Sequence, residues 1–448
     1  MIDSVRRRYG WYVVAVLTLA NICAFVDRQV LSLLVVPIKR DLGVTDTQMS
    51  YLIGLSFSLF YTVLGLPIGR WADRSDRRTI IAAGITLWSI MTALGGVAHS
   101  YGRLLLARVG VGVGEATLNA PAVSLVSDYF PSEGRGSAMS VYSLGVFLGS
   151  GLGYFIGGWA VDVAGAAGHR AWPIVGVLRP WQGVFFIVGL PGLLVALLML
   201  TVRDPRAPLS GAAQPPALAT LLRYVSANRR AFAAHGLGFA LYASVNFGIA
   251  AWLATFFVRT YAWTAVRAGM VQGVLTMTLG VAGVLVGGRV TDRLVRRGRT
   301  DAALRVGIIG ALGMLVAGSA YPLMPTAPLA VTVLAVVNLF AAFPWGAAAA
   351  GAADMVPTPI RAQGVALYFF VLTLVSAVGP TAVAFTTDYV FRDEGSVGYS
   401  LAIVNALGMS AAIILFVVGL PAFRRTLEGR SHWNAIGADA GSALRPRR

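Results

Sequence analysis

The decapeptide GRWADRSDRR, from Gly69 to Arg78, recurs in the second half of the chain as GRVTDRLVRR, from Gly288 to Arg297. Both copies read G-R-x-x-D-R, then two further residues, then R-R, and each follows the second apolar segment of its half. A repeat at matching positions predicts two related halves. Paired halves are typical of membrane carriers, which hold their binding site between them.

The composition indicates a lipid environment for most of the chain. Hydrophobic residues make up 57% of the 448 residues, charged residues make up 12%, and the mean hydropathy is +0.72. About 20 apolar residues form a helix that crosses the hydrocarbon layer of a bilayer, and twelve such spans follow one another from 11–38 to 397–421. The predicted fold class is an all-α membrane protein with twelve transmembrane helices in two pseudo-symmetric six-helix bundles.

The stretch 203–230 is rich in proline and arginine, as linkers are. We expect an N-terminal six-helix bundle over 1–202, a cytoplasmic linker over 203–230, a C-terminal six-helix bundle over 231–423 and a cytoplasmic tail over 424–448. Most basic residues lie in loops on one face, which the positive-inside rule makes cytoplasmic. An even number of spans then places both termini in the cytoplasm, with the chain in the plasma (inner) membrane.

Several classes of function lack their sequence signals. The net charge of +17 is spread over short loops, which fits membrane topology rather than nucleic-acid binding. Cys23 is the only cysteine, and the four histidines lack metal-ligand spacing, so we expect no disulfide, metal or cofactor. The sequence shows no constellation of catalytic residues, so it does not indicate an enzyme.

Gly110, Gly112 and Gly114 follow no β-strand, so they predict close helix packing rather than nucleotide binding. The glycines of GSGLGYFIGGW, at 149–159, predict a packing and bending surface that accommodates rocking, or a surface for packing alone.

Four charged residues lie inside predicted spans, where an ionisable side chain costs about 2.5–3.5 kcal/mol and usually faces a cavity or a partner. Arg108 and Glu115 are almost two helical turns apart, so they project from nearly the same face. Asp27 and Arg28 are adjacent, about 100° apart around the helix, so they point in different directions. A charge-balanced cluster of all four is the arrangement that lowers this cost.

The four charges suggest roles in binding and coupling. A guanidinium group matches phosphate or carboxylate, so Arg28 or Arg108 is expected to bind an anionic head group. A carboxylate that loses its arginine to the substrate is a plausible proton carrier, so Asp27 or Glu115 is expected to couple transport to protons. The further substrate-binding candidates are Asn119, Tyr242, Asn246 and Tyr368.

The basic loops suggest a conformational gate. Ion pairs that form only while the cytoplasmic side is closed would favour the outward-open state; the alternative is that these charges only set topology. The gate candidates are Asp73, Arg74, Arg77, Arg78, Asp128, Arg135, Asp292 and Arg293.

The repeated loop motif resembles the signature of the major facilitator superfamily, and the first half resembles its Spinster-like branch. The matching segments are FVDRQVLSLLVVPIKRDLGVTDTQ, LPIGRWADRSDRR, LLLARVGVGVGEA and SDYFPSEGRGSAM, within residues 10–160. This resemblance implies a fold that rocks between outward-open and inward-open states. It also implies an amphipathic anionic substrate, because eukaryotic relatives move lysophospholipids and sphingosine-1-phosphate. It places function at Asp27, Arg28, Arg108 and Glu115.

The predicted function is secondary active transport, coupled to protons, of a lysophospholipid or sphingolipid-like anion by alternating access. The expected partners are that substrate, protons and the lipid bilayer, with no nucleic acid, and the chain is expected to act as a monomer. The second half has no charge in mid-span to match Arg108, which suits a ligand with a charged head and an apolar tail. A sugar-acid or small organic-anion symporter and a multidrug exporter are the alternatives.

Overall fold

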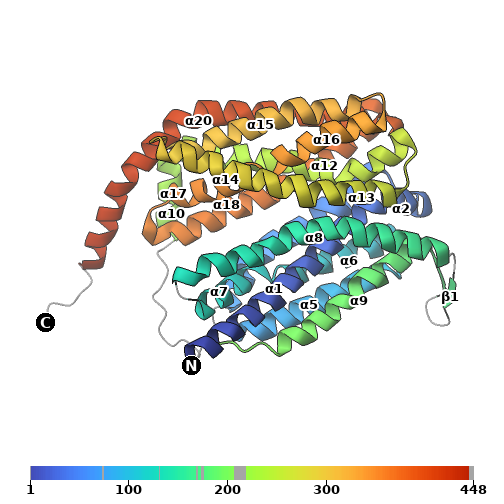
Figure 1. Cartoon of the computed structure of the whole chain (residues 1–448), viewed down its shortest axis with the longest axis horizontal. Coiled ribbons are helices and arrows are strands. Elements are labelled where there is room, and N and C mark those ends of the chain that lie inside the picture. The colour runs from blue at the N-terminus through green and yellow to red at the C-terminus, as the bar shows by residue number, and fades with distance from the viewer. Residues whose placement is uncertain are drawn as a thin grey trace. The chain divides into compact units, whose positions relative to one another are not determined.

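The computed structural model describes residues 2–72, 75–130, 132–167, 170–172, 176–205 and 218–442. Within these residues, twelve helical segments are long and apolar enough to cross a membrane, the number that the sequence predicts. They run from Arg8–Leu33 to Glu394–Gly429 (Figure 1). The predicted class, an all-α multi-pass membrane protein, is confirmed.

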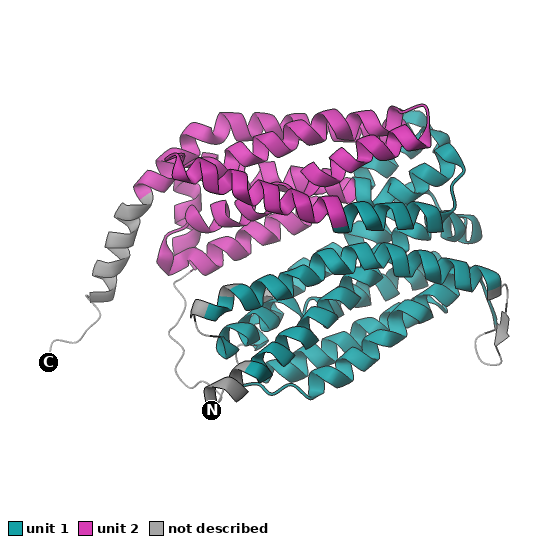
Figure 2. Cartoon of the chain, viewed as in Figure 1, with its two compact units in different colours: residues 1–211, 249–277, 380–397 teal, residues 212–248, 278–379, 398–448 magenta. Residues whose placement is uncertain are grey.

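Contacts divide the chain into two compact units (Figure 2). Unit 1 comprises Met1–Gly211, Ile249–Met277 and Pro380–Val397, and unit 2 comprises Ala212–Gly248, Thr278–Gly379 and Gly398–Arg448. The first boundary falls in the predicted linker, but unit 1 also includes parts of four spans from the second half. The predicted domain boundaries therefore stay a prediction.

Unit 1 holds most of the first half of the chain. Its elements are α1 (Ile2–Leu33), α2 (Val35–Leu42), α3 (Asp46–Ser50), η1 (Tyr51–Leu55), α4 (Ser56–Ala72), α5 (Arg77–Gly95), α6 (Tyr101–Glu115), α7 (Asn119–Tyr129), α8 (Ser132–Ala167), β1 (Arg170–Trp172), β2 (Gly176–Leu178), α9 (Pro180–Leu200), α13 (Ala265–Leu275), η6 (Thr386–Phe391) and η7 (Glu394–Ser396). The two strands pair antiparallel, with Arg170 opposite Leu178, and join α8 to α9 as a hairpin that the sequence did not predict.

Unit 2 holds most of the second half. Its elements are α10 (Leu218–Ala227), α11 (Arg229–Phe232), η2 (Ala233–Leu237), α14 (Val281–Arg296), α15 (Ala302–Ala320), η4 (Tyr321–Leu323), α16 (Ala327–Ala342), α17 (Trp345–Asp354), η5 (Thr358–Ile360) and α18 (Arg361–Ser376). A unit boundary falls within α12 (Gly238–Tyr261), η3 (Thr276–Gly280) and α19 (Val378–Phe385), and after the first residue of α20 (Val397–Ser442). The predicted tail at 424–448 thus begins inside a continuous helix.

The glycines of α8 bring two other helices close to it. A Cβ atom on Gly153 would lie 2.9 Å from Cβ of Gln29 on α1, and one on Gly158 would lie 3.4 Å from Cα of Val266 on α13. In Figure 1, α8 runs beside α1. The predicted packing role of these glycines is confirmed.

The glycines of α6 have the same effect. A Cβ atom on Gly112 would lie 2.6 Å from the carbonyl oxygen of Phe57 on α4, and one on Gly114 would lie 2.7 Å from the backbone nitrogen of Trp88 on α5. Because the backbones approach so closely, α6 is held between α4 and α5. This close packing fixes the position of two buried charged residues of α6, Arg108 and Glu115.

Candidate functional site

The four charged residues predicted to cluster do so, in two crossed ion pairs between α1 and α6; we call them the inner cluster. Arg28 donates from Nε to Oε2 of Glu115 over 2.7 Å, and its Nη2 contacts the same oxygen. Arg108 Nη1 lies 3.5 Å from Oδ1 of Asp27. Asp27 and Arg28 thus point towards different partners, as their adjacency on a helix requires.

Burial separates the two pairs. The side chains of Asp27 and Arg108 are 4% and 2% exposed, and Asp27 also accepts a hydrogen bond of 2.8 Å from Thr92. Glu115 is 1% exposed, whereas its partner Arg28 is 21% exposed. Arg28 is therefore the member of the inner cluster that an incoming molecule can contact.

Three aromatic rings surround the guanidinium group of Arg28. Its central carbon lies 4.4 Å from the ring centre of Phe57, 4.8 Å from that of Phe25 and 5.2 Å from that of Tyr61. Distances below about 6 Å allow a cation–π attraction. The rings also give an apolar surrounding to Arg28, the one partly exposed charge of the inner cluster.

Two atoms of the inner cluster lack a hydrogen-bond partner among the described residues. They are Oε1 of Glu115 and Nε of Arg108, and both are buried. An unpartnered buried polar atom costs roughly 1–3 kcal/mol. The Arg28–Glu115 pair therefore uses one carboxylate oxygen and leaves the other able to accept a proton.

Asn119, a predicted binding residue, lies in a chain of hydrogen bonds beside the inner cluster. Its side-chain amide donates to the hydroxyl of Tyr61, and its carbonyl oxygen accepts a bond of 2.7 Å from the hydroxyl of Tyr142. Tyr61 is also one of the rings around Arg28. The side chain of Tyr61 therefore links Asn119 to the guanidinium group of Arg28.

The three candidates from the second half have partners within unit 2. Tyr242 donates its hydroxyl to the carbonyl oxygen of Phe340, and Asn246 donates to the carbonyl oxygen of Tyr242 over 2.9 Å. The ring of Tyr368 packs on that of His235, with centroids 5.1 Å apart. Tyr242 and Tyr368 are buried and Asn246 is half-buried, and all three have local packing roles.

The loop motif of the first half centres on Arg77, which is fully buried. Its Nη1 lies 2.7 Å from Asp128, its Nε donates to Asp204 over 3.0 Å, and its Nη1 also donates to Ser124. Asp204 lies in the stretch read as a linker, and the sequence analysis missed it. Ser124 and Asp128 lie on α7 and Asp204 follows α9, so Arg77 ties the start of α5 to α7 and to the segment after α9.

The other gate candidates are more dispersed. Arg78 pairs with Asp76 over 2.9 Å, and Arg135 donates to the carbonyl oxygen of Ser127 over 3.1 Å. Asp292 and Arg293 lie exposed near the end of α14. Asp73 and Arg74 lie outside the described residues.

A family model for the Major Facilitator Superfamily matches residues 17–380. The chain belongs to this superfamily. A crystal structure of a bacterial homologue of the human lysosomal transporter Spinster, inward-facing and unoccupied, matches with a TM-score of 0.75 and 26% identity, over 94% of this chain and 97% of that one. The resemblance to the Spinster-like branch is confirmed.

Facilitators with different names are similar to this chain. An MFS-type efflux pump of Mycolicibacterium smegmatis is 28% identical over 94% of this chain and 95% of the pump. A probable L-galactonate transporter of Escherichia coli is 26% identical over 71% of this chain and 70% of its own length. The sphingosine-1-phosphate transporter SPNS2 of Danio rerio is 28% identical over 63% of this chain. The chain spans 56% of the length of SPNS2.

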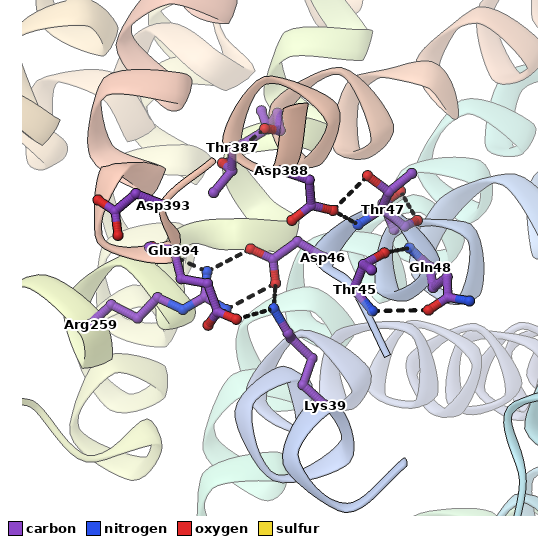
Figure 3. A network of polar contacts seen from close by, with 12 residues as sticks. Lys39, Thr45, Asp46, Thr47, Gln48, Arg259, Thr387, Asp388, Asp393 and Glu394 are labelled. Carbon is purple, nitrogen blue, oxygen red and sulfur yellow. Dashed lines mark hydrogen bonds and ion pairs between the residues drawn. The ribbon is translucent and has the colours of Figure 1, made fainter. Parts of the chain in front are cut away.

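A second charged cluster of this facilitator lies in unit 1 and was not predicted; we call it the outer network (Figure 3). Asp46 accepts hydrogen bonds of 2.6 and 2.9 Å from Arg259 and contacts Lys39 Nζ at 2.5 Å. Glu394 lies 2.8 Å from Lys39 and 3.0 Å from Arg259. Each cation contacts both carboxylates, so the four side chains form a closed ring.

Further bonds continue the outer network. The backbone N–H and the hydroxyl of Thr47 both donate to Oδ2 of Asp388 over 2.7 Å, and Asp388 faces Thr47 in Figure 3. The segment TDTQ supplied a usable signal, because Thr45 and Gln48 form a capping box that starts α3. That cap orients Asp46 and Thr47 at the helix start, where the partners from distant segments meet them.

Proposed function

We propose that this facilitator is a proton-coupled secondary transporter, not an enzyme, for an amphipathic organic anion of the lysophospholipid or sphingolipid type. We place it in the plasma (inner) membrane as a monomer, with both termini in the cytoplasm. The observation that carries the proposal is the Arg28–Glu115 pair, in which a partly exposed cation contacts a buried carboxylate. The similarity to SPNS2 supports a lipid-like substrate.

We assign the binding of the substrate's anionic head group to Arg28. It is 21% exposed, whereas Arg108 is 2% exposed and paired with Asp27, so a ligand reaches Arg28 first. A guanidinium group can bind a phosphate or carboxylate through two parallel hydrogen bonds. Phe25 and Phe57, beside the guanidinium, offer apolar surface to the part of the ligand next to the head.

We assign the uptake of the coupled proton to Glu115. An anion that binds Arg28 competes with Glu115 for the same guanidinium. A carboxylate buried without its cation is strongly unfavourable, so Glu115 takes up a proton as the anion binds. Substrate binding and protonation are then linked through one arginine, and Asp27 keeps its own partner, Arg108.

The outer network is assigned to a seal on the non-cytoplasmic side. The span Asp46–Ala72 carries the network at its start and leads to the basic loop before Arg77 at its end, so the two lie on opposite faces of the membrane. The ring joins α2 and α3 to the end of α12 and to η7, which come from both halves of the sequence. In alternating access such contacts must open once in each cycle.

Binding to the purified full chain tests the assignment. Native mass spectrometry would compare a lysophospholipid, L-galactonate and a cationic drug on the wild type and on Arg28→Gln, Arg28→Lys and Arg103→Gln. We expect Arg28→Gln to weaken lysophospholipid binding about 10- to 100-fold, because a hydrogen bond to a charged group contributes that much to affinity. Arg28→Lys, which keeps the positive charge, should recover part of the lost affinity.

The matched control is Arg103, an exposed arginine on the same helix as Glu115, and its variant should bind like the wild type. A thermal-unfolding scan confirms that each variant is folded. Wild-type affinity in Arg28→Gln removes Arg28 from the binding site. Preferential binding of L-galactonate, or of the cationic drug as the full-length similarity to the efflux pump would suggest, supports the corresponding alternative function.

A further inference from the structure

A pocket of about 310 Å³ lies in unit 2, far along the sequence from the inner cluster. The residues that line it come from the end of α10, from α11 and from the last part of the final span; they are Ala227, Asn228, Arg229, Arg230, Ala231, Ala422, Arg425 and Thr426. Three of these eight residues are arginines and, among the described residues that line the pocket, none is acidic. The volume is at the lower end of the range for ligand sites.

The three arginines of the pocket have no ion-pair partner among the described residues. The carboxylate of Asp301 is already paired with other arginines, because it accepts hydrogen bonds from Arg305 over 2.9 Å and from Arg424 over 2.8 Å. Burial raises the pKa of the Asp301 carboxyl, but the hydrogen bonds and charges of Arg305 and Arg424 outweigh burial and hold the pKa below its ordinary value. Arg425, next to Arg424, is left without a carboxylate.

The polar rim of the pocket is held in place by side chains that already have partners. The hydroxyl of Thr426 on α20 lies 3.0 Å from Oδ1 of Asn228, and the side-chain amide of Asn228 donates to the carbonyl oxygen of Tyr224. Ala231 and Ala422 are small, which leaves space between the two helices. The pocket is therefore a fixed concavity with three exposed arginines around it. Arg425 also donates from Nε to the carbonyl oxygen of Pro421 over 3.4 Å, which leaves its two terminal nitrogens for a ligand.

We propose that this basic pocket binds a phosphate group, supplied by the head group of an anionic phospholipid. Three guanidinium groups around one concavity match the several acceptor oxygens of a phosphate. The pocket lies where one transmembrane span begins at Arg229 and another ends at Gly429, which is the depth of lipid head groups. The site is separate from the substrate site proposed at Arg28 and does not depend on it.

Lipid binding to the full chain, in micelles of a neutral detergent, tests this site. Native mass spectrometry would measure the affinity for phosphatidylglycerol, phosphatidylcholine and inorganic phosphate. The test variant combines Arg229→Gln, Arg230→Gln and Arg425→Gln. The control combines Arg296→Gln, Arg297→Gln and Arg299→Gln, which removes the same charge from exposed residues at the end of α14.

We expect the wild type and the control to bind phosphatidylglycerol about tenfold more tightly than the test variant does, as one lost charged hydrogen bond already predicts. If inorganic phosphate does not displace bound phosphatidylglycerol, the site is assigned to lipid head groups. Inorganic phosphate that binds with the same arginine dependence supports a phosphate site and assigns it to the free ion. Equal affinity in the wild type and the test variant, or an equal loss in the control, overturns the proposal.

Discussion

The inner cluster and the outer network each contain two basic and two acidic side chains, but they distribute their contacts differently. In the inner cluster, each arginine has one carboxylate partner, Glu115 for Arg28 and Asp27 for Arg108. In the outer network, Lys39 and Arg259 each contact both Asp46 and Glu394. Separate pairs can exchange one partner at a time, which suits binding and proton transfer. A closed ring resists the loss of single contacts, which suits a seal.

The largest expected effect comes from the buried centre of the outer network. Asp46 is fully buried, so Asp46→Asn removes the buried one of the two carboxylates that contact Lys39 and Arg259, and breaking a buried pair costs about 3–5 kcal/mol. The variant should populate the state that is open on this side. In a Cys23→Ala background, a Ser50→Cys reporter should react with a membrane-impermeant maleimide more than about tenfold faster.

Ser50 suits this reporter because it is buried and its hydroxyl lies 3.1 Å from that of Thr381. Lys39→Met and Arg259→Met should increase labelling in the same direction as Asp46→Asn. Unchanged labelling in all three variants would show that the outer network is not a seal.

An intermediate effect is expected where the inner cluster exchanges partners. Glu115→Gln no longer competes for Arg28 with a full charge, so the anion should bind about tenfold more tightly while substrate-driven proton uptake is lost. Uptake into liposomes that contain a pH-sensitive dye measures both quantities. In Asp27→Asn, which leaves the Arg28–Glu115 pair intact, proton uptake should persist. Proton uptake that survives in Glu115→Gln and disappears in Asp27→Asn would reverse the assignment.

The smallest effect is expected at the exposed side of the ring. Glu394 is 63% exposed, and exposed ion pairs contribute less than about 1 kcal/mol. Glu394→Gln should therefore change Ser50→Cys labelling less than about fivefold, and high salt should remove the difference because it screens exposed charges. A change as large as that of Asp46→Asn would mean that the carboxylates share the seal equally.

The sequence predicts the features that depend on local pattern. Hydropathy predicts the twelve spans. The spacing within the inner cluster predicts that Asp27 and Arg28 take different directions, while Arg108 and Glu115 share a face. The sequence does not predict which cation meets which anion. That choice depends on the rotation of α1 against α6, which the close packing of Gly112 and Gly114 on neighbouring helices helps to fix.

The features that the sequence analysis missed depend on contacts between distant segments. Lys39 and Arg259 read as ordinary loop charges, because no local pattern shows that both reach Asp46. Asp204 lies in a proline-rich stretch that reads as a linker, yet it accepts three hydrogen bonds from Arg77. Polar residues such as Tyr242 are equally ambiguous, since a buried hydroxyl can serve a ligand or a backbone carbonyl.

The one-to-one pairing of the inner cluster has an electrical consequence. When the carrier is empty, the two arginines and two carboxylates sum to zero charge. When a singly charged anion binds Arg28 and Glu115 takes one proton, the sum is again zero. Moving a charge through the membrane potential costs about 2.3 kcal/mol per 100 mV, and the proposed exchange of one anion and one proton avoids that cost in both directions of the cycle. Transport of a singly charged anion should therefore be electroneutral, and its rate should depend on the pH gradient but not on the voltage.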